Sequence, residues 1–169
     1  VTRRVRIEQD LRGAWERGEL TLAYQPIYRV SDKTLLGAEA LLRWRHPVRG
    51  MVSPATFIPI AEGSGSILEI GEWVFRQAAA QVQRWRTELH PDFQISVNKS
   101  PVQFQQPAQV HTAWMAHLSD LGLPGQSIVI EITEGLLLET DERVTTQLLD
   151  FHDAGIQVAL DDFGTGYSS

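Results

Sequence analysis

The chain has 169 residues, of which 43% are hydrophobic and 21% are charged, a composition typical of one globular domain with a substantial core. Its formal net charge of −6 argues against a general binder of nucleic-acid polymers or membrane surfaces, because both favour basic faces. Cysteine is absent, which excludes disulfides, thiolate catalysis and zinc–thiolate sites. No signal peptide and no apolar run near the roughly 18 residues of a membrane helix are visible, so the sequence predicts a cytoplasmic segment without membrane contact.

The first half of the chain predicts a helix, a strand pair and two further helices. Apolar residues at helical spacing predict a helix over residues 7–17, ending at Gly18. Strands are predicted over residues 20–28 and 35–44, and the short polar turn between them indicates an antiparallel hairpin. Ser53 and Pro54 are a capping residue and a first-turn proline, and predict a short helix that is broken at residues 63–65. A long amphipathic helix is predicted over residues 67–89.

The second half alternates strands with helices. Strands are predicted over residues 93–97, 128–132 and 156–160, and helices over residues 107–121 and 139–154, ending at Gly122 and Gly155. This alternation predicts an α/β fold whose parallel sheet has right-handed crossovers. The pattern alone leaves open whether the sheet closes into a barrel.

Four of the predicted strands carry a carboxylate or carboxamide at or near the C-terminal end: Glu39, Asn98, Glu131 and Asp161. An α/β barrel builds its active site at that end, from several strands at once. Successive side chains on a strand point to opposite faces, so these four turn to the interior if the apolar faces pack beneath the helices. The same alternation aims Lys99 away from the site. A single strand-end acid is commonly a helix cap or a solvated loop residue, but four in succession favour a shared site.

Several carboxylates in a site of low dielectric repel one another unless a cation or a proton intervenes. With no cysteine and no nearby histidine, the ligands would be hard oxygens, which favour Mg²⁺ or Mn²⁺ over zinc. Such an ion indicates phosphodiester chemistry, and the adjacent Asp161 and Asp162 suit a two-metal arrangement. Arg43, on the same strand face as Glu39, could meet a phosphate oxygen, although an isolated arginine here would be an ordinary surface residue.

With these residues the sequence resembles the EAL family of phosphodiesterases, which hydrolyse cyclic di-GMP to linear pGpG. The segments that carry the resemblance occur in the family's order: YQPI at 24–27, GAEALLRW at 37–44, SPATFIP at 53–59, SVN at 96–98, EITE at 131–134 and DDFGTGYSS at 161–169. The resemblance implies a TIM-like (β/α)8 barrel with an antiparallel first strand pair, of which about the first five strands are present. It further implies that residues 1–10 are an upstream linker or helix, and that residues 11–169 are an EAL domain incomplete at its C-terminus.

The resemblance also implies roles for individual residues. Glu39, Asn98, Glu131 and Asp161 would ligate the first metal and Asp162 would help to hold a second. Gln25, Leu41, Arg43 and Asn98 would contact the substrate. Glu134 would anchor the loop beginning at Asp162, and it would complete a catalytic set with Glu39, Glu131, Asp161 and Asp162. The expected partners are cyclic di-GMP, a second copy in a homodimer and an upstream diguanylate cyclase-like or sensory domain. A lysine and further acids lie downstream in the family, so this chain alone is expected to be inactive.

Two other functions fit parts of the sequence. A non-catalytic receptor for cyclic di-GMP is the main alternative, although such degenerate members usually lack metal ligands that are present here. An unrelated barrel with two carboxylates, such as a glycoside hydrolase, would use the tryptophans for sugar stacking. Trp73 and Trp85 lie at helical spacing on apolar faces, which favours core packing instead.

Overall fold

The computed structural model describes residues 2–139 and 141–161 of the chain. The structure is built on a mixed sheet with strand order β1-β2-β4-β5-β6, and β3 pairs with the C-terminal end of β2. The strands are β1 Leu20–Tyr28, β2 Leu35–His46, β3 Gly50–Val52, β4 Gln94–Asn98, β5 Ile128–Ile132 and β6 Gln157–Leu160. β1 and β2 are antiparallel, whereas β2, β4, β5 and β6 pair in parallel. The predicted hairpin and parallel sheet are therefore confirmed, and the short β3 is an addition to the prediction.

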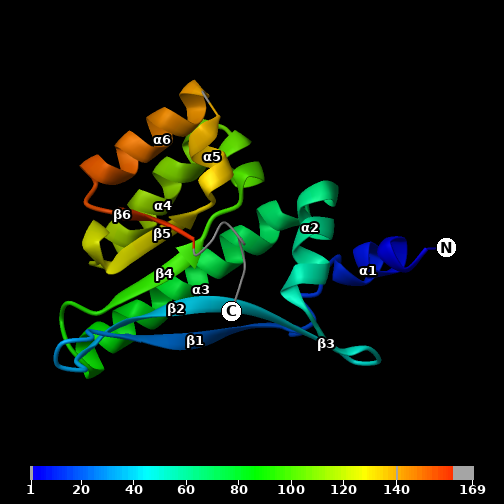
Figure 1. The fold of residues 1–169 in the computed structure, drawn as a ribbon, viewed down its shortest axis with the longest axis horizontal. Coiled ribbons are helices and arrows are strands. Elements are labelled where there is room, and N and C mark those ends of the chain that lie inside the picture. Colours follow the sequence, from blue (N-terminus) through cyan, green and yellow to red (C-terminus); the bar gives the residue numbers. More distant parts are fainter. Residues whose placement is uncertain (1, 140, 162–169) are drawn as a thin grey trace.

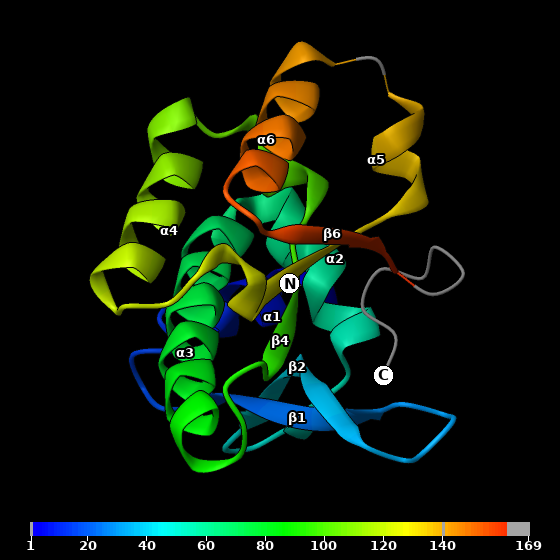
Figure 2. The same ribbon diagram turned by 90° about the vertical axis from the view of Figure 1, so that its left-hand side faces the viewer.

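The helices lie mainly on the outer side of this curved sheet. They are α1 Arg3–Leu11, α2 Pro54–Ser64, α3 Ser66–Glu88, α4 Ala108–Asp120, α5 Glu134–Leu138 and α6 Glu142–Asp153, with 3-10 turns η1 Pro101–Gln105 and η2 Gly125–Ser127. Figure 1 shows the long β1–β2 hairpin on one side of the molecule and α4, α5 and α6 gathered on the other. In the turned view of Figure 2, α3, α4 and α6 line the outer side of the sheet. This arrangement of helices outside a curling sheet is part of an α/β barrel.

Two helix predictions differ from the structure. The first helix was expected over residues 7–17 but occupies Arg3–Leu11, because the Thr2 hydroxyl accepts a hydrogen bond from the Val5 N–H at 3.3 Å and begins the helix earlier. The expected helix over residues 139–154 begins only at Glu142, where Asp141 caps the Arg143 N–H at 2.9 Å. The short α5, capped by Thr133, precedes it and is absent from the prediction.

The core lies between the sheet and its helices, as strand alternation predicts. Ile128, Ile130 and Ile132 of β5 are at most 2% exposed, whereas the intervening Glu131 is only partly buried. Across the helix layer, the rings of Phe75 and Trp114 stack at a centroid distance of 4.2 Å. One face of each parallel strand is thus fixed beneath the helices, which leaves the other face for polar side chains.

In the part of the chain that the structure describes, the sheet has two edge strands, β1 and β6. All four residues of β6 are exposed, and β6 pairs there with β5 alone. Leu160 is 53% exposed and Val158 is 37% exposed, so apolar surface lies along this edge. Within the same described residues, no helix combines the length and apolar character needed to cross a membrane.

Candidate functional site

Asn98 and Glu131 are brought together directly by the parallel pairing of β4 with β5. Their Cα positions are partners in the strand register, so both side chains stand on the same face of neighbouring strands. Adjacent strands lie about 4.8 Å apart, a spacing at which two neighbouring oxygen donors can share one cation. This juxtaposition at the C-terminal end of β4 and β5 is the geometric centre of the candidate site.

Asp161 extends the site to the next strand. It follows β6 directly and its backbone N–H donates to the Ile132 carbonyl at 2.8 Å, which continues the parallel pairing beyond the end of the strand. Because Ala159 is the register partner of Glu131, Asp161 lies on the same face one pleat further along. The Asp161 side chain is 6% exposed. Such deep burial of an acid is uncommon unless a partner compensates its charge.

Glu39 lies on β2, the neighbour of β4 on the side away from β5, and on the same face of the sheet as Asn98. Its place in the strand differs from the prediction. It lies in the interior of the long β2 rather than at the end of that strand. It is nevertheless the last β2 residue paired with β4, opposite Ser96, because β2 continues beyond it only against β1 and β3. Relative to the sheet, Glu39 thus lies one pleat before Asn98, and strand tilt in a barrel produces just this kind of stagger.

The expected substrate residues follow one face of the β1–β2 hairpin. Gln25 is the register partner of Glu39. Leu41 and Arg43 stand at two-residue steps from Glu39 and share its face. Gln25 is exposed, Arg43 is partly buried with a guanidinium N–H donating to the Leu42 carbonyl at 3.1 Å, and Leu41 is 6% exposed. The structure thus places Gln25 and Arg43 where a ligand above Glu39 could reach them, and Leu41 is buried on the same face.

The remaining two expected residues are Glu134 and Asp162. Glu134 begins α5 just after Thr133 and is exposed. Asp162, and with it the segment 163–169, lies outside the described residues. The proposed anchoring of that segment by Glu134 therefore stays a prediction.

Lys99 points away from the site, as predicted, but its surroundings are not foreseen by the sequence. Its side chain is 2% exposed, and Nζ lies 4.0 Å from the Trp114 ring centroid, 5.0 Å from that of Phe104 and 5.6 Å from that of Phe151. Among the described residues, Nζ has no hydrogen-bond partner. Burial lowers the pKa of Lys99 to about 8, against a smaller raising effect of Glu72. We call the three rings around this ammonium the aromatic box.

The donor set of the strand ends suits a hard divalent cation. It comprises carboxylates and one amide oxygen, the ligand types that Mg²⁺ and Mn²⁺ accept. Within residues 2–139 and 141–161, no group of three or more acidic or histidine side chains is close enough to hold a metal unaided. An ion bound here would therefore need the amide of Asn98 or further ligands in addition to the carboxylates.

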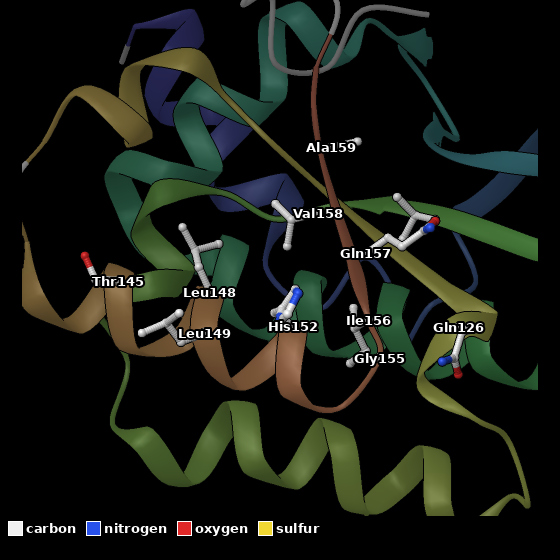
Figure 3. A pocket seen from close by; sticks show the side chains of 11 residues that line it. Gln126, Thr145, Leu148, Leu149, His152, Gly155, Ile156, Gln157, Val158 and Ala159 are labelled. Carbon is white, nitrogen blue, oxygen red and sulfur yellow. The ribbon is translucent and has the colours of Figure 1, made fainter.

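A further hollow of the molecule is lined by none of these strand-end residues. A cavity of about 840 Å³ lies between α6 and β6, and its lining includes Leu148, Leu149, His152 and Val158. Figure 3 shows these side chains, on the helix-facing side of β6. The lining also includes Val129 and Ala159, from the strand faces that carry Glu131 and Asp161, so the cavity borders both faces of β6.

A mixed sheet of this topology, with polar donors at the ends of its parallel strands, defines an α/β barrel-type protein with its site on the C-terminal edge. Residues 8–169 match the model of the EAL domain, and the chain belongs to this family. This result confirms the expected family, and the expected barrel-like α/β fold is confirmed by the solved structures of EAL domains that the chain resembles.

Two relatives of the chain are described as cyclic di-GMP phosphodiesterases. The chain is 39% identical over 160 residues to the bifunctional diguanylate cyclase/cyclic di-GMP phosphodiesterase MucR of Pseudomonas aeruginosa, covering 95% of this chain and 23% of MucR. It is 36% identical over 165 residues to the probable cyclic di-GMP phosphodiesterase PdeI of Escherichia coli, covering 96% of this chain and 21% of PdeI. A solved MucR phosphodiesterase in complex with cyclic di-GMP superposes with a TM-score of 0.87 at 37% identity, covering 97% of this chain and 66% of that one. The chain thus spans about a fifth to a quarter of the length of MucR, PdeI and several other curated relatives, and 55% of the length of three mycobacterial ones.

Proposed function

We propose that the protein carrying this domain is a metal-dependent phosphodiesterase that hydrolyses cyclic di-GMP to linear pGpG. The observation that carries the proposal is the register pairing of Asn98 with Glu131, with Asp161 buried beside the next strand on the same face. Family membership supports the substrate, because both named relatives are described as acting on cyclic di-GMP.

In the proposed chemistry, the strand ends bind the metal ions and the β1–β2 hairpin binds the substrate. Glu39, Asn98, Glu131 and Asp161 would hold one Mg²⁺ or Mn²⁺, and Asp162 would help to hold a second. When bound, such ions supply a nucleophilic water at neutral pH and charge stabilisation of an in-line displacement at phosphorus. This chain's own residues orient the substrate around that centre.

Arg43 is the residue suited to a phosphate oxygen, since its planar guanidinium presents several N–H donors. Gln25, opposite Glu39 on β1, offers both a donor and an acceptor to a guanine edge or a ribose hydroxyl. Leu41, on the same strand face, would contribute apolar contact. Together these side chains would hold one phosphodiester over the acidic face, and correct placement of the reacting groups accounts for much of such catalysis.

The first test is hydrolysis of cyclic di-GMP with Mg²⁺ or Mn²⁺, comparing this chain with a protein that continues through the remainder of the barrel. We expect turnover only by the longer protein, because a complete barrel takes roughly 250 residues. In the longer protein, Glu131→Gln should lower kcat by at least about a hundredfold, the order by which loss of a transition-state contact slows catalysis. Asp153→Asn, at an 80% exposed side chain, is the matched control and should retain activity.

A receptor without catalysis is the competing function. Binding of cyclic di-GMP without turnover by the longer protein would establish it and refute the phosphodiesterase. For the whole protein we further propose a homodimer, an upstream diguanylate cyclase-like or sensory domain and a cytoplasmic location. The greater length of the relatives and the bifunctional description of MucR support the additional domain.

A further inference from the structure

Ser100 connects the end of β4 to a distant helix. Its hydroxyl lies 2.5 Å from Oε2 of Glu62 on α2, the distance of a charge-assisted O–H to carboxylate hydrogen bond. Ser100 is 1% exposed and Glu62 is partly buried, so bulk water does not easily replace this bond. The two residues are 38 positions apart, and no sequence pattern indicates that they meet.

Every polar group of Ser100 is engaged. Its hydroxyl donates to Glu62 and accepts from the Val102 N–H at 3.2 Å. Its backbone N–H donates to the Gln103 side chain at 3.0 Å, and its carbonyl accepts from the Gln103 N–H at 2.9 Å. Ser100 therefore has one conformation that satisfies all of these partners, and the turn after β4 is fixed by them.

The turn is also held from the side of α3. Gln103 packs so closely over Gly71 that a Cβ added there would lie 2.0 Å from its side-chain nitrogen. On the sheet side, the Lys99 N–H donates to the Glu131 carbonyl at 3.0 Å. The segment directly after Asn98 is thus fixed between α2, α3 and β5, and Glu62 reaches it from α2 with a charged group.

The position of this segment determines where the Asn98 amide points. Only Lys99 separates Asn98, the last residue of β4, from Ser100, whose own backbone is extended, so a shift of Ser100 would move the end of β4 relative to Glu131. A partner that orients a metal ligand from outside the ligand shell typically changes metal affinity by about 10–100-fold when it is removed. A hydrogen bond to a charged group is strong enough to hold the end of β4 in place.

We propose that Glu62 is a positioning residue that acts through Ser100 to hold Asn98 in register with Glu131 at the metal site. This inference rests on the proposed function, since it takes the strand ends as the place of metal binding. It assigns Glu62 no contact with substrate or metal.

The test measures Mn²⁺ affinity of the full-length protein by EPR of the free ion, at a temperature where each variant is folded by circular dichroism. We expect Glu62→Ala to weaken binding by about tenfold or more. Glu62→Gln keeps an oxygen that can accept the Ser100 hydroxyl and should restore affinity to within about threefold of wild type. Asp150→Ala is the matched control, because it removes a carboxylate that bonds His111 at 2.8 Å between α4 and α6 and should leave Mn²⁺ affinity unchanged.

A double-mutant cycle with Ser100→Ala tests the route. If Glu62 acts through Ser100, the double variant should bind Mn²⁺ as weakly as Glu62→Ala alone. Additive losses, equal losses for the glutamine and alanine variants, or wild-type affinity in Glu62→Ala would each overturn the inference. Failure of the wild-type protein to bind Mn²⁺ would overturn both the inference and the proposed metal site. Normal Mn²⁺ binding without hydrolysis of cyclic di-GMP would overturn only the proposed function.

Discussion

Replacement of the buried Lys99 by methionine should stabilise the protein at neutral pH. The ammonium is 2% exposed within the aromatic box and, among the described residues, lacks a hydrogen-bond partner. Methionine has a similar length, fills irregular apolar space and makes favourable contacts with aromatic rings. Lys99→Met therefore removes a desolvated charge while leaving the packing near Trp114 filled.

Two opposing effects set the change in the free energy of unfolding that Lys99→Met should cause. Burial lowers the pKa of Lys99 from 10.5 to about 8, and at about 1.4 kcal/mol per pH unit this corresponds to a destabilisation of about 3 kcal/mol for the charged form. Contact of a desolvated ammonium with an aromatic face contributes up to about 2 kcal/mol of stabilisation. Burial is the larger effect, so we expect Lys99→Met to raise the free energy of unfolding by about 1 kcal/mol at pH 7.

The pH dependence of the stability difference tests the role of the Lys99 charge more sharply than its size at pH 7. Between pH 8 and 10.5 the unfolded chain binds the proton of Lys99 and the folded chain releases it, so wild-type stability rises with pH across this window. Below pH 8 the full destabilisation is present. The advantage of Lys99→Met should accordingly be greatest below pH 8 and fall steadily between pH 8 and 10.5.

The assay is urea unfolding of both proteins from pH 7 to 10.5, followed by tryptophan fluorescence, with the difference in unfolding free energy taken at each pH. Lys33→Met is the control, because Lys33 is exposed in a turn and its replacement changes no buried charge. A difference between wild type and Lys99→Met that stays constant across the whole pH range would refute the reasoning.

Two further predictions concern packing and substrate binding. At Gly37 a Cβ would lie 2.2 Å from a backbone carbonyl of β4, so Gly37→Ala should lower the free energy of unfolding by about 2 kcal/mol in denaturant titration. Gly135→Ala meets no atom within 4 Å in α5 and should instead raise it by about 0.5–1 kcal/mol, and an equal loss in both variants would contradict the argument. In steady-state kinetics of the longer protein, Arg43→Ala should raise KM for cyclic di-GMP by about tenfold with little change in kcat, as expected for loss of ground-state binding. A kcat that falls as far as kcat/KM would show instead that Arg43 acts only in the transition state.

Most of the helices and strands, the hairpin, the parallel sheet and the family could be predicted from the amino-acid sequence, whereas β3 and α5 could not. These are local properties: apolar spacing specifies helices and strands, and a short polar turn specifies an antiparallel pair. Alternation along β5 was sufficient to separate Glu131 from its buried isoleucine neighbours. The same rule correctly predicted that Lys99 points away from the site, but it could not predict which residues surround the Lys99 side chain.

Contacts between residues that are distant in the chain became visible only in the folded molecule. The extension of β2 beyond Glu39, the aromatic box around Lys99 and the bond between Glu62 and Ser100 all join segments that are well separated along the chain. Local patterns carry no information about such meetings, because strand register and helix packing are set by the shape of the whole core. The physical reason is the same for the site: the sequence supplies its donors one strand at a time, and the pairing of parallel strands brings them to one edge.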